Sequence, residues 1–165
     1  MAVLGSPGVQ GATIDFDLNQ SGGRASVALK DGRLELPGLF ELPALDFSQL
    51  STDMLWQFEG ERISVQLPNL RFSNADAQGE ALLKWHTGEG RARLPGVLDL
   101  QGSLSRANLA KIHRYLPQDV ERDVRDYLRD AVSQGRASGV RFRVKGDLND
   151  FPFASARQGE FRVTA

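Results

Sequence analysis

The chain has 165 residues, of which 41% are hydrophobic and 25% charged, a composition typical of a globular domain and unlike disordered or collagen-like chains. It contains no cysteine and only two histidines, which excludes disulfides, cysteine-ligated metal and thiol catalysis and leaves little basis for a multi-histidine metal site. The formal net charge is −1, with the basic residues concentrated after residue 105. We interpret this mild excess as solvated surface and expect no nucleic-acid partner, since no nucleic-acid-binding motif accompanies it.

The first hundred residues show the period of two that is typical of β-strands. Ile14, Phe16 and Leu18 alternate with acidic residues, residues 19–23 form a turn, and a second alternating run follows. Asp31 and Gly32 form a dipeptide that is typical of a two-residue hairpin turn. Residues 38–50 are apolar without a period and contain a proline, so we expect a loop or an edge segment there.

Further alternating runs cover residues 52–58, 63–72, 81–85 and 98–104. The phase of the run at residues 63–72 changes after Pro68, which indicates a β-bulge or a break. Short turns separate these runs, and short connections cannot make parallel crossovers. The sequence therefore predicts an antiparallel meander with one apolar and one polar face.

The period changes after Ser105, which is a plausible helix N-cap. A short helical stripe ends at Pro117, and a longer amphipathic helix is predicted from residue 120 to Gly135. We expect the apolar residues of both helices to form the face that packs on the sheet. They are Leu109, Ile112, Val120, Val124, Leu128 and Val132. Strand-like alternation resumes at Val140 and again at Phe161.

The predicted fold class is therefore mainly β with a two-helix insertion (α+β), a curved antiparallel meander with an amphipathic helix packed on or beside its apolar face. We expect residues 1–165 to form one β-rich segment of a longer chain. Within it, residues 1–104 would form antiparallel strands, 105–135 the helical insertion and 136–165 the closing strands.

Few residues carry recognisable chemistry. Asp15, Asp17 and Asn19 begin like a calcium loop, but Gln20 and Ser26 stand where that loop needs Gly and Glu. We therefore interpret the two aspartates as the solvated face of a strand. No nucleophile motif or phosphate-binding loop is present, so we predict no catalytic residues, no metal site, no cofactor and no enzymatic activity.

Several stretches resemble the AsmA-like YhdP family of Gram-negative envelope proteins. They are Gly11-Ala-Thr-Ile-Asp-Phe-Asp-Leu18, Leu67-Pro-Asn-Leu-Arg-Phe-Ser-Asn-Ala-Asp76, Arg114-Tyr-Leu-Pro117, Tyr127-Leu128, Gly135, Gly146-Asp-Leu-Asn-Asp-Phe-Pro-Phe153 and Phe161-Arg-Val163. The Tyr127-Leu128 pair departs from the Trp-Leu that is frequent in the family. The resemblance covers nearly the whole chain, and its motifs are structural rather than catalytic.

The resemblance implies an internal periplasmic segment of a long protein anchored in the inner membrane, with an apolar β-groove that carries phospholipid toward the outer membrane and helps maintain the permeability barrier. The implied partners are phospholipid acyl chains and neighbouring segments of the same chain, and open edge strands would let the isolated segment self-associate. The candidate groove residues are the apolar members of the alternating runs: Ile14, Phe16, Leu18, Ala25, Val27, Leu29, Leu34, Leu36, Met54, Trp56, Leu83 and Trp85.

Two alternatives remain open at this point. In the first, the segment is a structural or protein-interaction module with a sealed core, and the basic helix face of Arg122, Arg125 and Arg129 docks a partner. In the second, it is a hydrolase with an unrecognised carboxylate site near Asp15, Asp17 or Asp76.

Overall fold

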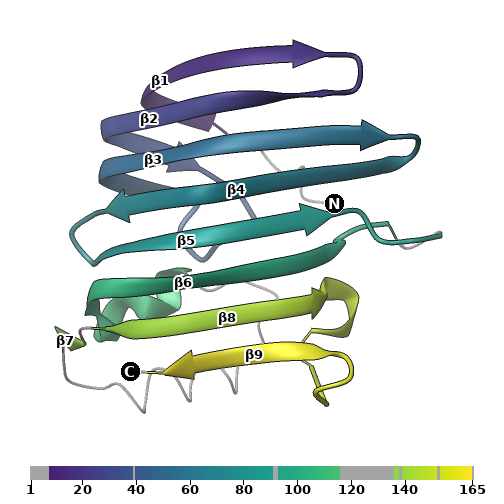
Figure 1. Cartoon of the computed structure of the whole chain (residues 1–165). Helices are drawn as coiled ribbons and strands as arrows, with labels where there is room; N and C mark the ends of the chain where they lie inside the picture. Colours follow the sequence, from purple (N-terminus) through teal and green to yellow (C-terminus); the bar gives the residue numbers. More distant parts are fainter. Residues whose placement is uncertain are drawn as a thin grey trace.

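The computed structural model describes residues 8–38, 40–90, 93–115, 136–137, 139–151 and 153–164. These residues form a single nine-stranded antiparallel sheet in the order β1-β2-β3-β4-β5-β6-β8-β9, with the short β7 paired to β6 (Figure 1). The strands are β1 (Gly8–Asn19), β2 (Gly22–Glu35), β3 (Ala44–Glu59), β4 (Arg62–Ser73), β5 (Ala77–His86), β6 (Val97–Asn108), β7 (Arg136–Ala137), β8 (Val140–Asp147) and β9 (Gly159–Thr164). Apart from β7, neighbours in the sheet follow one another along the chain, which is the meander that the short turns predicted.

The predicted α+β fold class with a two-helix insertion is wrong. Among the described residues there is no α-helix, and the first predicted helix is replaced by the continuation of β6 and the 3-10 helix η1 (Leu109–Tyr115). Ser105, expected as an N-cap, lies in β6, and its hydroxyl donates to the carbonyl of Gln78 on β5 at 3.2 Å. The second predicted helix, with Val120, Val124, Leu128 and Val132, lies outside the described residues. A second 3-10 turn, η2 (Leu148–Asp150), follows β8.

One predicted break in the strands is also wrong, and another is shorter than predicted. Asp31 and Gly32 lie within β2, where Asp31 has a φ of 48° and Gly11 on β1 has a φ of 76°. The pairing of β1 with β2 shifts register at this point, so the dipeptide forms a bulge rather than a turn. Residues 38–50 are predicted to form a loop or an edge segment. The described residues before Ala44 do lie outside β2 and β3, but residues 44–50 form the first part of β3.

The predicted irregularity at Pro68 is confirmed. The pairing of β4 shifts register against both neighbours, near Ser51 to Leu55 on β3 and near Leu67 to Leu70 on β4 itself. The side chain of Asn69 fills the gap: its Oδ1 accepts from the backbone N–H of Asp53 at 2.7 Å, and its Nδ2 donates to the Asp53 carboxylate at 2.7 Å. The bulge is therefore held by side-chain hydrogen bonds where the ladder is interrupted.

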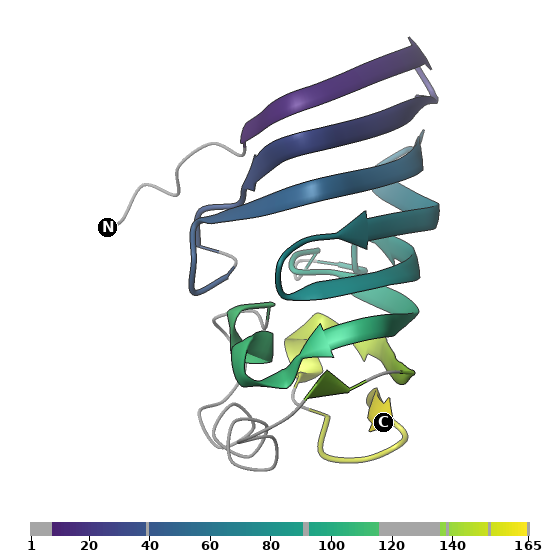
Figure 2. The ribbon, with the colours of Figure 1, turned by 90° about the vertical axis from the view of Figure 1, so that its left-hand side faces the viewer.

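The sheet is a curved and twisted single layer, and η1 lies on one side of it (Figure 2). Cross-strand register assigns apolar side chains to that side. We call this the apolar face and define it by the cross-strand rows of Leu18, Trp56, Val65, Trp85 and Leu98; of Phe16, Ala25, Met54, Leu67, Leu83, Leu100, Val144 and Phe161; of Ile14, Val27, Ala81 and Phe142; and of Ala12, Leu29, Leu50, Phe72, Leu104 and Val140.

Charged and polar side chains occupy the other side, which we call the polar face. One cross-strand row of this face contains seven charged or polar side chains and one leucine, Leu55. The seven are Asp17, Arg24, Gln66, Lys84, Asp99, Lys145 and Glu160. On β8, Arg143 lies between two acids of this face, with its Nη2 3.5 Å from Asp99 and its Nε 3.1 Å from Glu160. These pairs are partly exposed, so they fix cross-strand register more than they add stability.

Candidate functional site

The apolar face is the candidate site, and its burial is uneven. The core lies at the end of the strands where β4 turns into β5: Leu29, Leu45 and Phe47 form one buried cluster, and Leu104, Ala107 and Val140 form another. Phe72 packs against both clusters and joins them. This end of the apolar face is therefore an ordinary hydrophobic core.

The same face is open on β1. Phe16 is 68% exposed, Leu18 is 59% exposed and Ile14 is 45% exposed. On β9, at the other edge, Phe161 and Val163 are also exposed. Large apolar side chains that lie together on one face without cover are unusual for a protein surface and indicate a binding surface.

The predicted groove residues divide accordingly. Ten of them share the apolar face: Ile14, Phe16, Leu18, Ala25, Val27, Leu29, Met54, Trp56, Leu83 and Trp85. Leu34 lies beyond the β2 bulge and packs against the cluster of Leu29, and Leu36 lies after the end of β2, where its N–H donates to the carbonyl of Pro43 at 2.8 Å. Ala25 and Leu29 are buried, so they belong to the core rather than to an accessible surface. The side chains of Leu109 and Ile112, predicted on a helix face, are outside the described set.

Aromatic rings on the apolar face lie over glycines of neighbouring strands. A Cβ added at Gly23 on β2 would lie 2.4 Å from Cζ2 of Trp56 on β3. A Cβ added at Gly102 on β6 would lie 2.5 Å from Cζ of Phe142 on β8. Because glycine has no side chain, these rings can pack directly on the backbone of the neighbouring strand, and the apolar surface continues from one strand to the next.

A polar network closes the apolar face at the β4–β5 turn. The buried Asn74 donates from Nδ2 to the hydroxyl of Tyr115 on η1 at 2.8 Å, and that hydroxyl donates to Oδ2 of Asp76 at 3.1 Å. Asn74 Oδ1 accepts from the N–H groups of Asp76 and Ala77 at 2.9 and 2.7 Å. Burial and the neighbouring Asp76 carboxylate raise the pKa of Tyr115 to about 12, so the phenol stays protonated and keeps its donor.

Two cations of η1 complete this network. Lys111 Nζ lies 3.3 Å from Asp76 Oδ1, and Arg114 Nη1 lies 3.6 Å from Asp76 Oδ2. The ring of Tyr115 packs against the core cluster of Leu29. Sequence reasoning named Asp76 only as a conceivable catalytic acid and missed its role in docking η1, because the contact joins residues about forty positions apart.

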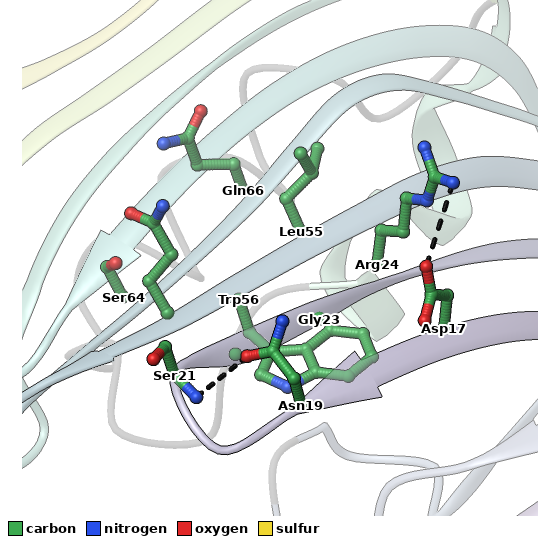
Figure 3. A pocket seen from close by; sticks show the side chains of 11 residues that line it. Asp17, Asn19, Ser21, Gly23, Arg24, Leu55, Trp56, Ser64 and Gln66 are labelled. Carbon is green, nitrogen blue, oxygen red and sulfur yellow. Dashed lines mark hydrogen bonds and ion pairs between the residues drawn. The ribbon is translucent and has the colours of Figure 1, made fainter.

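Two hollows lie on the polar face. One lies beside the β1–β2 turn, where Arg24 Nη2 is 3.7 Å from Asp17 and Asn19 Oδ1 accepts from the N–H of Ser21 at 2.8 Å (Figure 3). The other spans β1 to β6, with Lys30, Arg71 and Glu80 among its lining residues. Asp15 and Asp17 are exposed on β1, as predicted for the solvated face of a strand. Among the described residues, no group of three His, Asp or Glu side chains could hold a metal ion.

Comparison with known proteins agrees with the sequence resemblance. A family model described as YhdP protein matches residues 3–165. The chain belongs to the YhdP family. No curated protein and no solved structure matches it.

Membership of the YhdP family makes this a cell-envelope chain. The structure also explains two of the YhdP-like stretches in the sequence, because Asn74 and Asp76 at the end of one meet Arg114 and Tyr115 at the start of the other. None of the described helices is long and apolar enough to cross a membrane.

Proposed function

We propose that this segment provides an open apolar surface on which phospholipid acyl chains lie during transfer between the inner and outer membranes, as part of a longer, inner-membrane-anchored periplasmic protein. The exposure of Ile14, Phe16 and Leu18 on one face of β1 is the observation that carries this proposal. The role is binding rather than catalysis.

The energetics suit a sliding ligand. Each methylene of an acyl chain that leaves water gains about 0.8 kcal/mol. Aliphatic and aromatic side chains supply this gain without directional bonds, so a chain can shift along the surface with little loss. Trp56 and Trp85 lie on the same face and extend its apolar surface across β3 and β5.

The ends of the sheet support a role within a longer array. Among the described strands, β1 and β9 are the edges. An edge strand has unpaired N–H and C=O groups, which a neighbouring segment of the same protein or a second copy of this one would satisfy. Continuation of the sheet in this way would join the apolar faces of successive segments.

Photo-crosslinking along β1 tests the proposal. A photoreactive residue is placed in turn at positions 13 to 18 of the whole protein in cells, and phospholipid adducts are detected by mass spectrometry. We expect adducts at Ile14, Phe16 and Leu18, and none at Thr13, Asp15 and Asp17, which serve as matched controls on the polar face. Equal labelling of both sets, or no labelling of a functional protein, would refute the proposal.

The rival interpretation, a sealed interaction module, requires these β1 side chains to be buried. Their exposure argues against it. The basic face that it invokes, Arg122, Arg125 and Arg129, lies outside the described residues.

A further inference from the structure

The network at the β4–β5 turn contains more positive than negative charge. Lys111 and Arg114 share the single carboxylate of Asp76. Arg106 reaches the same turn from β6, and its Nη1 donates to the carbonyl of Ala75 at 3.0 Å and its Nη2 to that of Asn74. Within the described part of the chain, one acid therefore faces three cations at this turn.

The two cations of η1 are partly exposed to solvent, whereas the carboxylate that they share is mostly buried. The side chains of Lys111 and Arg114 are 43% and 37% exposed, whereas that of Asp76 is 11% exposed. Both ammonium and guanidinium groups thus have N–H donors left over for a ligand after their contact with Asp76. Phosphate oxygens are acceptors that suit such donors.

The position of this cluster is as informative as its charge. Tyr115, the next residue after Arg114, packs on the core cluster of Leu29 and Phe47. The cations therefore border the apolar face at the β4–β5 end of the strands, while the open part of that face lies on β1, three strands away from β4, or about 15 Å across the sheet. A molecule with apolar chains and an anionic head would meet both surfaces at once.

We propose that Lys111 and Arg114 bind the anionic phosphate headgroup of a lipid whose acyl chains lie on the apolar face. The inference rests on the proposed function and specifies which part of the lipid is recognised and where. Asp76 holds both cations in place and sets the strength of the site, because it competes with the phosphate for the same donors. Arg106 is tied to backbone carbonyls and adds positive potential without contacting the headgroup.

The test compares lipids that differ only in the headgroup. Binding of dihexanoyl phosphatidylglycerol and of uncharged dihexanoyl glycerol to the chain is measured by isothermal titration calorimetry, because Trp56 and Trp85 lie at the opposite end of the strands from Lys111 and would not report on it. We expect the phosphatidylglycerol to bind about tenfold more tightly, the effect of one charge-assisted hydrogen bond. In the double variant Lys111→Gln, Arg114→Gln, this preference should disappear while dihexanoyl glycerol still binds.

Two further variants control for charge and for folding. The pair Arg71→Gln, Lys84→Gln removes the same charge from the polar face and should keep the preference. The conservative swap Lys111→Arg, Arg114→Lys keeps both charges and should keep it too, even if the glutamine variant unfolds. Loss of the preference in the polar-face pair to the same extent would show a general field effect and overturn the assignment.

The remaining outcomes are distinct. If the unmodified chain binds both lipids equally, the headgroup site is refuted and the proposed function stands. If it binds neither, both proposals fail. If glycerol phosphate displaces phosphatidylglycerol at equal concentration, the cluster is a site for free phosphate and the lipid assignment is wrong.

Discussion

Exposed and buried residues of the apolar face should respond very differently to the same substitution. Phe16→Thr and Leu29→Thr introduce the same β-branched residue into neighbouring strands of the sheet. Phe16 is 68% exposed and Leu29 is 3% exposed. With about a third of its surface buried, Phe16 contributes roughly 0.5–1 kcal/mol of the 1.5–3 kcal/mol that full burial gives. Leu29→Thr leaves a cavity and buries a hydroxyl, so it should cost about 3–5 kcal/mol.

Urea unfolding measures the difference directly. The free energy of unfolding is taken from the transition of tryptophan fluorescence, with far-ultraviolet circular dichroism as a second probe of two-state behaviour. We expect Phe16→Thr to lie within 1 kcal/mol of the unmodified chain. A loss at Phe16 as large as that at Leu29, at a protein concentration where the chain is monomeric, would mean that β1 is covered in solution. The open-face interpretation would then be wrong.

Three further substitutions test the supports of this face. Gly23→Ala places a Cβ 2.4 Å from Trp56, so it should cost about 1–3 kcal/mol in urea unfolding and shift the tryptophan emission. Tyr115→Phe removes the hydroxyl that joins η1 to the β4–β5 turn. It should lower the free energy of unfolding by about 1–3 kcal/mol and make hydrogen exchange at the turn faster. Hydrogen bonds from Ser26 and from Asn69 hold the pKa of Asp53 below its ordinary 3.8. Their contribution to stability is therefore present above pH 3.8 and is lost as the pH falls through the lower pKa of the folded state. Asn69→Ala should make the midpoint of urea unfolding depend less on pH in this acid range.

The alternation of apolar residues predicted most strands because one face of the sheet is apolar and the other polar. It failed for residues 44–50, where the apolar positions change phase within one strand. Leu45 and Phe47 are buried at odd positions, and Leu50 packs against the same cluster from an even one. The bulge at Asp31 on the neighbouring strand accompanies this change, and a phase change inside a strand looks aperiodic in sequence.

The prediction of the first helix, from Leu109 onward, failed for a different reason. Leu109 and Ile112 are three residues apart, a spacing that suits a 3-10 helix as well as an α-helix. Ser105 has the residue type of an N-cap, but pairing with β5 extends β6 as far as Asn108. Tertiary pairing thus decided the local structure. The contact of Tyr115 with Asp76 could not be predicted from spacing, since nothing in the intervening sequence links them.

The uneven burial of the apolar face explains how a single-layer sheet can be both stable and open. A sheet needs cover on at least one face to fold, because its alternating side chains must bury surface somewhere. Here the row of Leu29, Phe72 and Leu104 supplies that core under η1, and the network of Asp76 fixes the cover in place. Stability is therefore concentrated at one end of the strands. On β1, Phe16 and Leu18 lie outside this core, so substitutions at these two positions can test lipid contact without unfolding the protein.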